Sequence, residues 1–315
     1  LFSGTAARKR KIIERTWKGS GYAHFLLSER GKIRPIDAPT IQDRQVHKVI
    51  THKILYPLYK PSMIYNNGAS QLGKGLRFSF ERLNQDLRRH YRKYGRNGYI
   101  VLIDLKNFFP SVPHNTVYNR HDDLILDEKI KSLCDRLVID FSNHTKLDRG
   151  MPLGIEPSQI EMVSLPSSVD NFAKCQLSIK AFAHYMDDYY ALFHTHEEAE
   201  RFVTQINHRF NQIGLTINTK KCKIVSMTGP FKYCKAKFYL TETGKVIVRG
   251  NRDNLKRARK KMKSFKTKFD QGLMELKQIE QWYQTVIAYF RNFNDHNRIL
   301  RLNRIYYNLF GGVCA

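Results

Sequence analysis

The pattern of apolar and polar residues divides the chain into short apolar runs and longer segments with helical spacing. Residues 99–105 (YIVLIDL) form a continuous β-branched and apolar run, which is typical of a buried strand. Residues 181–193 (AFAHYMDDYYALF) form a second run, which predicts two strands joined by a tight turn at its adjacent acids. Residues 237–248 predict a hairpin that turns at Thr243 and Gly244.

Helical spacing dominates most of the rest of the chain. In residues 31–55 we expect a strand broken by Pro35 and Pro39 and then a helix after Thr40. Further helices are predicted over residues 113–141, 158–177, 196–214 and from about 250 to 309. Pro166 lies inside the helix predicted over residues 158–177, where it either destabilises or kinks that helix. Gly214 is the expected C-cap of the helix predicted over residues 196–214.

Composition adds a strong bias in charge. The 315 residues contain 42% hydrophobic residues, enough for a large core, and carry a net charge of +26. Such an excess indicates a polyanionic partner, most simply nucleic acid, with a membrane surface as the weaker option. There is no apolar run near 18 residues and no recognisable signal peptide, and Leu1 suggests a processed or trimmed chain. The five cysteines lack CxxC spacing, which favours reduced thiols in a cytoplasmic protein.

Acidic residues occur where the apolar runs predict buried strands. Asp104 lies near the end of the first run, and Asp187 and Asp188 lie inside the second. Carboxylates that lose hydration side by side repel one another, so three of them on one sheet would need a partner. Two Mg²⁺ ions suit such a set and support nucleotidyl transfer. In the alternative interpretation, Asp104 caps a turn and the pair marks an exposed hairpin.

A second acid pair follows His121, at Asp122 and Asp123. Its surroundings predict an amphipathic helix with Lys129 and Lys131 nearby. We therefore interpret this segment as a solvated helix face.

Six motifs occur in an order that resembles one family, the reverse transcriptases, and specifically the bacterial branch of group II intron, retron and diversity-generating enzymes. The motifs are KIRPIDAPT, YIVLIDLKNFFPSV, GMPLGIEPSQ, YMDD, GLTINTKKCKIV and KFYLTETGK. The resemblance implies an α+β right-hand polymerase with fingers, a palm with an antiparallel sheet, and a helical thumb. It places the fingers at residues 1–98, the palm at 99–248 with a fingers insertion at about 113–150, and the thumb at 249–315.

The resemblance also assigns the acids. It implies that Asp104 and Asp187 bind two Mg²⁺ ions, with Mn²⁺ as an alternative, and that Asp188 supports them. The backbone carbonyl of Leu105 is implied as a further ligand. Lys221, with Lys220 as the alternate, is implied as the general acid that protonates pyrophosphate; the competing interpretation is a solvated lysine.

Nucleotide selection is implied at the fifth residue after Asp104. The family has a sugar-sensing aromatic there, which is Phe109 in this chain. A bulky ring would clash with a ribose 2′-OH and so favour dNTPs. The alternative is that Phe108 is the gate and Phe109 is a core residue.

Other nucleotide contacts are implied by the fingers motif and by LGIEPSQ. Arg34 matches the arginine that grips the triphosphate, a role that suits a bidentate guanidinium. Lys32 and Arg30 are possible helpers. Gly154 permits close approach of the backbone, and Gln159 follows Ser158 in the LGxxxSQ pattern.

The segment from Arg252 to Lys268 carries nine basic residues and one acid. A helix of this composition is expected to follow a phosphate backbone, since a merely soluble face would mix charges. The predicted contacts are Lys256, Arg257, Arg259, Lys260, Lys261 and Lys263.

The subtype is left open between several bacterial groups. LGIEPSQ is close to the form in diversity-generating enzymes and in phage-defence systems, whereas the retron signatures VTG and NAxxH are missing. No endonuclease, RNase H or integrase segment is recognised, which favours an enzyme that relies on a dedicated noncoding RNA or accessory protein, with oligomerisation open. The expected partners are an RNA template, a DNA or RNA primer and dNTPs. Two alternatives remain, a template-independent or protein-primed DNA polymerase of antiphage defence and a noncatalytic RNA-binding protein.

Overall fold

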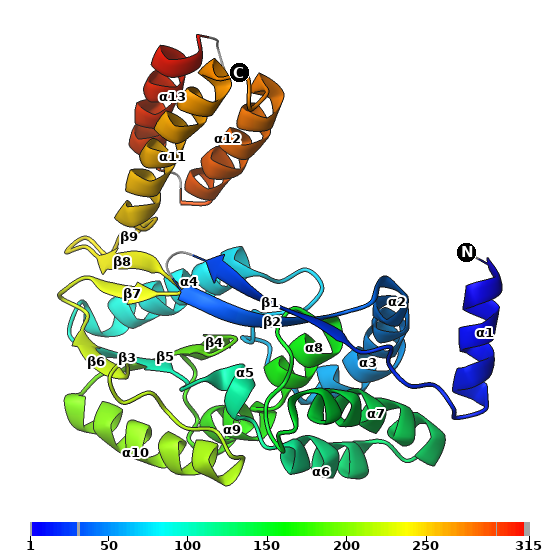
Figure 1. Ribbon diagram of the computed structural model, residues 1–315. Helices are drawn as coiled ribbons and strands as arrows, with labels where there is room; N and C mark the ends of the chain where they lie inside the picture. The colour runs from blue at the N-terminus through cyan, green and yellow to red at the C-terminus, as the bar shows by residue number, and fades with distance from the viewer. Residues whose placement is uncertain (1, 30–31, 294, 312–315) are drawn as a thin grey trace. The chain divides into compact units, whose positions relative to one another are not determined.

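The chain separates into two compact units in the structure, a computed structural model that describes residues 2–29, 32–293 and 295–311. The first unit comprises the chain up to Leu83 together with Ile100–Ile224, and the second comprises Asn84–Tyr99 and the chain from Val225 onward. Figure 1 shows the helices and strands of both units. This division cuts the sequence differently from the expected fingers, palm and thumb, whose boundaries stay a prediction.

The first unit combines two small sheets with most of the helices. Its strands are β1 (Tyr22–Glu29), β2 (Lys32–Pro39), β3 (Tyr99–Asp104), β4 (Phe182–Tyr185), β5 (Asp188–Phe193) and the start of β6 (Lys223–Ser226). Its helices are α1 (Phe2–Ile13), α2 (Ile41–Ile50), α3 (Tyr56–Tyr59), the first part of α4 (Leu76–Tyr94), α5 (Phe108–Ser111), α6 (His114–Leu124), α7 (Glu128–Thr145), α8 (Glu156–Ser164), α9 (Ser167–Asn171) and α10 (His196–Gln212). The short segments η1 (Thr51–Leu55), η2 (Lys60–Ser62) and η3 (Phe172–Gln176) continue neighbouring helices.

The main sheet has the strand order β4-β5-β3-β6. The strands β4 and β5 pair antiparallel up to Tyr185 and Asp188, so Met186 and Asp187 form a two-residue loop. The open edge of β4 is covered by a loop, because Asn67 forms a parallel bridge with His184 and the Gly68 amide donates to the His184 carbonyl. The predicted strands and the tight turn at the acids are therefore present.

Gly68 is required in that covering loop. A Cβ atom at this position would lie 1.9 Å from Ser79 Oγ, closer than any van der Waals contact allows. The glycine thus lets the loop approach α4 closely enough to pair with β4.

The hairpin of β1 and β2 corrects one expectation from the sequence. Pro35 and Pro39 do not break the strand; they lie within β2, opposite Leu26 and Tyr22. Within the described part of the chain the two strands pair only with each other, so each has one unpaired edge. A proline whose nitrogen faces that edge removes no ladder hydrogen bond.

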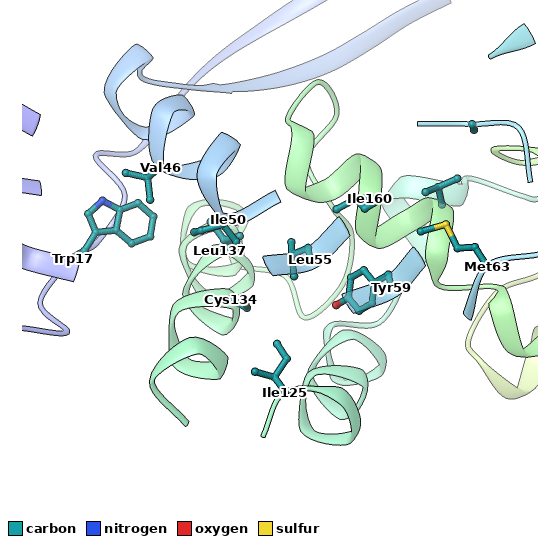
Figure 2. Close-up of a cluster of buried hydrophobic side chains, with 12 residues drawn as sticks. Trp17, Val46, Ile50, Leu55, Tyr59, Met63, Ile125, Cys134, Leu137 and Ile160 are labelled. Carbon is teal, nitrogen blue, oxygen red and sulfur yellow. The ribbon is translucent and has the colours of Figure 1, made fainter. Parts of the chain in front are cut away.

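A hydrophobic cluster joins α2, η1, α3, α7 and α8 in the first unit (Figure 2). Leu55 and Tyr59 are fully buried, and Ile50 is 1% exposed. The side chains labelled in Figure 2 are Trp17, Val46, Ile50, Leu55, Tyr59, Met63, Ile125, Cys134, Leu137 and Ile160. This apolar contact stabilises the helices that flank the main sheet.

The second unit contains a three-stranded sheet and a helical bundle. Its elements are the remainder of α4 and β6, the strands β7 (Phe231–Tyr233), β8 (Ala236–Leu240) and β9 (Val246–Arg249), and the helices α11 (Arg252–Asp270), α12 (Leu276–Arg291) and α13 (His296–Phe310). The sheet order is β7-β8-β9, with the predicted turn at Gly244, where φ is +77°. The three helices pack around fully buried Met262, Tyr283 and Leu302.

The other features expected from the sequence are a proline inside a helix, a glycine C-cap, no membrane-spanning helix and reduced cysteines. Pro166 separates α8 from α9, and Gly214, with φ +74°, follows the end of α10. No helix among the described residues is long and apolar enough to cross a membrane. Cysteines 134, 175, 222 and 234 carry free thiols, and Cys314 lies outside the described residues.

Candidate active site

The three acids meet at one end of the main sheet. Asp104 ends β3, and β3 is the direct neighbour of β5, which begins at Asp188. The Leu105 amide donates to the Asp187 carbonyl at 3.2 Å, so the backbones of the two acid sites touch. All three acids are partly exposed. The sheet thus brings together residues that are 83 positions apart in the chain, Asp104 and Asp187.

Asp104 is held from two sides by the segment that precedes β6. Lys221 Nζ lies 2.7 Å from each carboxylate oxygen, and Asn218 Nδ2 donates to Oδ1 at 3.3 Å. The Asn218 amide also donates to the Asp104 carbonyl at 2.8 Å. The carboxylate is therefore fixed in direction and its charge is balanced. Lys220 and Lys221 are both exposed, and it is the predicted general acid Lys221 that bonds to Asp104.

The turn between β4 and β5 is strained. Met186 has a φ of +55°, and Asp187, the second loop residue, does not share the positive sign. This sign pattern is that of a type II′ turn, which favours glycine at the first position. A methionine there costs on the order of 1–3 kcal/mol, and such strain persists only when surrounding contacts hold the turn.

The two phenylalanines after Asp104 have different environments. Phe108 is 4% exposed and packs into the core, whereas Phe109 is partly exposed. Their rings meet edge to face at 5.7 Å, and the Phe109 carbonyl accepts a hydrogen bond from the Met151 amide. Phe109 is thus the more exposed of the two rings, and its role as a gate stays a prediction.

The LGIEPSQ motif forms a turn followed by α8. Gly154 has a φ of +92° and no atom lies within 4 Å of its ideal Cβ position, so its backbone is open to a ligand. Gln159 is half-buried on α8. Ser158 is fully buried, and its Oγ has no hydrogen-bond partner among the described residues.

Arg34 lies on β2 opposite Leu27, with a partly buried side chain. Lys32 begins β2, but its side chain is outside the described residues, as is all of Arg30. A contact that the sequence did not predict fixes this hairpin. Asp37 Oδ1 lies 2.8 Å from His24 Nδ1 and 2.9 Å from His144 Nε2, so it joins both strands to α7.

The basic residues of α11 lie on the solvent side of their helix. The buried positions of α11 are Leu255, Ala258, Met262 and Phe265. The six predicted contact residues, Lys256, Arg257, Arg259, Lys260, Lys261 and Lys263, are all exposed. The helix therefore offers a concentrated positive surface to solvent.

The interpretation of residues 121–123 as a solvated face is wrong for His121. Asp122 and Asp123 are exposed, and Asp122 pairs with Lys131 at 2.6 Å. His121, however, is 1% exposed. Its Nδ1 lies 2.6 Å from Asp135 Oδ1, and its Nε2 lies 3.0 Å from Glu161 Oε1. Glu161 lies on α8, and the spacing of residues within α6 does not indicate that α6 contacts α8.

Comparisons with known proteins identify the family and the fold. Residues 18–269 match the family described as reverse transcriptase (RNA-dependent DNA polymerase). This match covers most of the chain, so the chain belongs to the reverse transcriptase family, whose members are nucleotidyltransferases that use divalent metal ions.

Two solved structures are similar to the chain. The chain is similar to telomerase from Candida albicans in complex with a TWJ fragment of telomeric RNA, with a TM-score of 0.58 and 11% identity over 96% of this chain and 64% of the telomerase chain. It also matches apo telomerase from Candida tropicalis truncated from its C-terminal domain, with a TM-score of 0.49 and 11% identity over 78% and 59% of the two chains. The chain thus spans less than two thirds of either telomerase chain.

The family match and the first of these structures confirm the predicted α+β right-hand polymerase fold. A comparison with curated protein sequences gives no match.

Proposed function

We propose that the protein is an RNA-directed DNA polymerase that adds dNTPs to a primer 3′-OH on an RNA template. The observation that carries this proposal is the meeting of Asp104 with Asp187 and Asp188 on neighbouring strands. Three acids at the adjoining ends of neighbouring strands suit a cation-binding site, and the family to which the chain belongs supplies the reaction.

The donor set fits Mg²⁺. Asp104, Asp187 and Asp188 offer hard carboxylate oxygens, and the Leu105 carbonyl is the proposed fourth donor. Asp104 is 16% exposed on its side chain and is directed by Asn218 and Lys221, so it is preorganised. When bound, a pair of Mg²⁺ ions would lower the pKa of the primer hydroxyl and neutralise charge on the leaving pyrophosphate.

The chain's own side chains would place the other reactants. Lys221 balances the charge of Asp104 in the structure, and we propose that it gives a proton to pyrophosphate when the site is filled. Arg34, with Lys32, would bind the triphosphate, since a guanidinium binds phosphate oxygens in pairs. The open backbone at Gly154 and the side chain of Gln159 would contact the nucleotide or its template partner.

Primer extension tests the function directly. Purified protein is incubated with a primer on a generic RNA template, with each dNTP alone and with all four. Full-length product that depends on template sequence supports the proposal. A homopolymer that ignores the template would instead support a template-independent enzyme, and tight RNA binding without synthesis would support a binding protein.

We propose a bacterial or phage retroelement or defence system as the setting, with a dedicated RNA as template. The support is LGIEPSQ and the missing retron signatures. Sequencing of RNA that copurifies with the protein from its native host tests this part, and an RNA population no different from total RNA would contradict it.

Replacing Phe109 by alanine should admit ribonucleotides. The preference for dNTPs over rNTPs should fall by about 5- to 150-fold, since removing a steric clash in a packed site is worth ~1–3 kcal/mol. The measurement is the ratio of kcat/KM for dGTP and GTP in single-nucleotide addition. Phe108→Leu is the matched control, because that ring is buried and should change stability but not the ratio. An unchanged ratio in Phe109→Ala would refute the gate.

Replacing Lys256, Lys260 and Lys263 together by glutamine should weaken nucleic-acid binding and its salt dependence. The three positions lie on one exposed stretch of α11, spaced for a common face. Each lost phosphate contact reduces the slope of log K against log salt by about 0.7–0.9, so the slope should fall by about 2–3.

Fluorescence anisotropy of an RNA–DNA duplex over a salt series measures this slope. A control variant replaces the exposed lysines Lys53, Lys129 and Lys180 by glutamine and has the same change in net charge. Equal slopes for the two triple variants would show that binding reads net charge and not the α11 surface.

A further inference from the structure

One buried histidine next to the catalytic turn has no role in the function proposed above. His184 lies on β4, three residues before Asp187, and is 0% exposed. Its Nδ1 lies 3.0 Å from the carbonyl oxygen of Met186, and its Nε2 lies 3.0 Å from Asp170 Oδ2 on α9. Asp170 is also 0% exposed. The pair therefore connects helix α9 to the backbone of the turn between β4 and β5.

The hydrogen bonds fix where the protons lie. The Met186 carbonyl can only accept, so His184 Nδ1 carries a proton and donates it. A proton also lies between Nε2 and Asp170 Oδ2, because a carboxylate oxygen and a bare imidazole nitrogen cannot bond to each other without one. The imidazole thus donates to the turn whichever of the two partners holds the shared proton.

His184 itself is fixed by contacts on its other sides. Its ring stacks on Tyr189 with centroids 4.5 Å apart and planes within 9°. Its carbonyl accepts from the Gly68 amide at 3.0 Å, in the loop that covers β4. Tyr189 is 1% exposed and packs in turn on Phe210. These contacts restrict the position of the His184 imidazole. The bond from its Nδ1 therefore restricts the position of the Met186 carbonyl.

The held atom belongs to the strained residue. Met186 has a φ of +55°, and the peptide carbonyl that follows it leads directly into Asp187. Without a bond to that carbonyl, the peptide unit is able to rotate toward a less strained conformation, and the Asp187 side chain would rotate with it. The strain that the sequence places at Met186 thus needs a compensating contact, and His184 supplies one.

We propose that His184, held by Asp170, is a positioning residue for DNA synthesis that fixes the Met186–Asp187 turn and so directs the Asp187 carboxylate. This inference rests on the proposed function for its catalytic part. It differs from the roles assigned to the acids, because His184 and Asp170 are both 0% exposed and act through the backbone of the turn. Supporting residues of this kind typically contribute about 10- to 100-fold to metal affinity or activity.

Three variants separate positioning from folding and from charge. His184→Ala removes the bond to the turn. Asp170→Ala leaves the imidazole without its buried anchor. Asp170→Asn is the conservative variant, because the asparagine Nδ2 can donate to Nε2 of a neutral imidazole that still donates from Nδ1 to Met186. The folded fraction of each variant is determined by urea denaturation before activity is compared.

The experiment measures single-nucleotide addition and, separately, Mn²⁺ binding by electron paramagnetic resonance. We expect His184→Ala and Asp170→Ala to lower kcat by about 10- to 100-fold with the KM for dNTP changed less than about threefold. Both should weaken Mn²⁺ binding by at least about tenfold. Asp170→Asn should keep kcat and the Mn²⁺ dissociation constant within about threefold of wild type, since it keeps the geometry.

Other outcomes overturn the inference. A loss of activity that only matches the folded fraction, or a change confined to KM, would show a structural role alone. Asp170→Asn as impaired as Asp170→Ala would show that charge and not geometry matters. If the wild-type protein makes no product, the proposed function fails, and Mn²⁺ binding still decides the positioning claim: an unchanged dissociation constant in His184→Ala overturns it.

Discussion

Asp104→Asn and Asp187→Asn are each expected to reduce DNA synthesis by more than about 100-fold. Even groups that only support a metal ligand contribute about 10- to 100-fold, and these carboxylates are the proposed ligands themselves. The amide has nearly the same shape as the carboxylate, so the fold should remain intact. The measurement is single-turnover extension of a primer on an RNA template, with the urea midpoint as the test of folding.

Asp123→Asn is the matched control for this prediction. It makes the same change in charge at an acid that also belongs to a pair but is exposed on α6. It should retain wild-type activity. Synthesis by Asp104→Asn within about tenfold of wild type would rule out the proposed metal site.

Replacement of Asp104 also has an expected effect on Lys221. The ammonium lies 2.7 Å from both carboxylate oxygens, so the variant Asp104→Asn leaves it without its counter-charge. Because Lys221 is half-exposed, at 52%, water can solvate it and the stability change should be below about 1 kcal/mol. A large loss of activity with little loss of stability is therefore the expected signature of this site.

His121→Gln is expected to lower the free energy of unfolding by about 3–5 kcal/mol. The imidazole nitrogens bond to Asp135 and Glu161, and Glu161 also accepts from Tyr59 Oη at 2.9 Å. Removing one member of a buried charged set leaves the other charges uncompensated, which costs this amount. Chemical denaturation at about pH 6 gives the difference in stability.

The same histidine makes the stability of the wild-type protein depend on pH. Burial alone would lower the pKa of His121, but the hydrogen bonds to Asp135 and Glu161 outweigh it and raise the pKa to about 9. The unfolded histidine has a pKa of about 6.5, so the folded state binds the extra proton between these two values. The stabilisation is fully present below about pH 6.5 and is lost as the pH rises through about 9, an effect of ~3 kcal/mol.

Unfolding curves from about pH 6 to 9.5 test this dependence. His121→Gln should lose the part of the dependence that wild type shows in this window. His208→Gln is the control, because that side chain is exposed on α10 and should keep the wild-type dependence. Parallel curves for wild type and His121→Gln would show that His121 is not charged in the folded protein.

The sequence by itself determined the elements that depend on neighbouring residues. The continuous β-branched run before Asp104 forms β3, and the helical period before Gly214 forms α10. The tight turn at the acid pair was predicted because two adjacent aspartates interrupt an apolar and aromatic run, and the structure has this turn. Pro35 and Pro39 misled the prediction, since the effect of a proline depends on which edge of a strand is paired.

The resemblance in motif order supplied the candidate site residues, but not their surroundings. The sequence left open whether Phe108 or Phe109 is the gate, and burial distinguishes the two rings only in the fold. It left Lys220 and Lys221 open, and only Lys221 contacts Asp104. In both cases the residues are neighbours in the chain, so no local property separates them.

Only the tertiary structure decided which distant residues meet. The strand order places β3 beside β5 and so joins Asp104 to Asp187. Packing of α6 on α7 and α8 buries His121, which the sequence pattern had indicated as exposed. The bond between His184 on β4 and Asp170 on α9 connects two residues that are 14 positions apart in the chain. Charge and hydrogen-bond partners act over a few ångströms in space, and that distance is fixed only when the whole chain has folded.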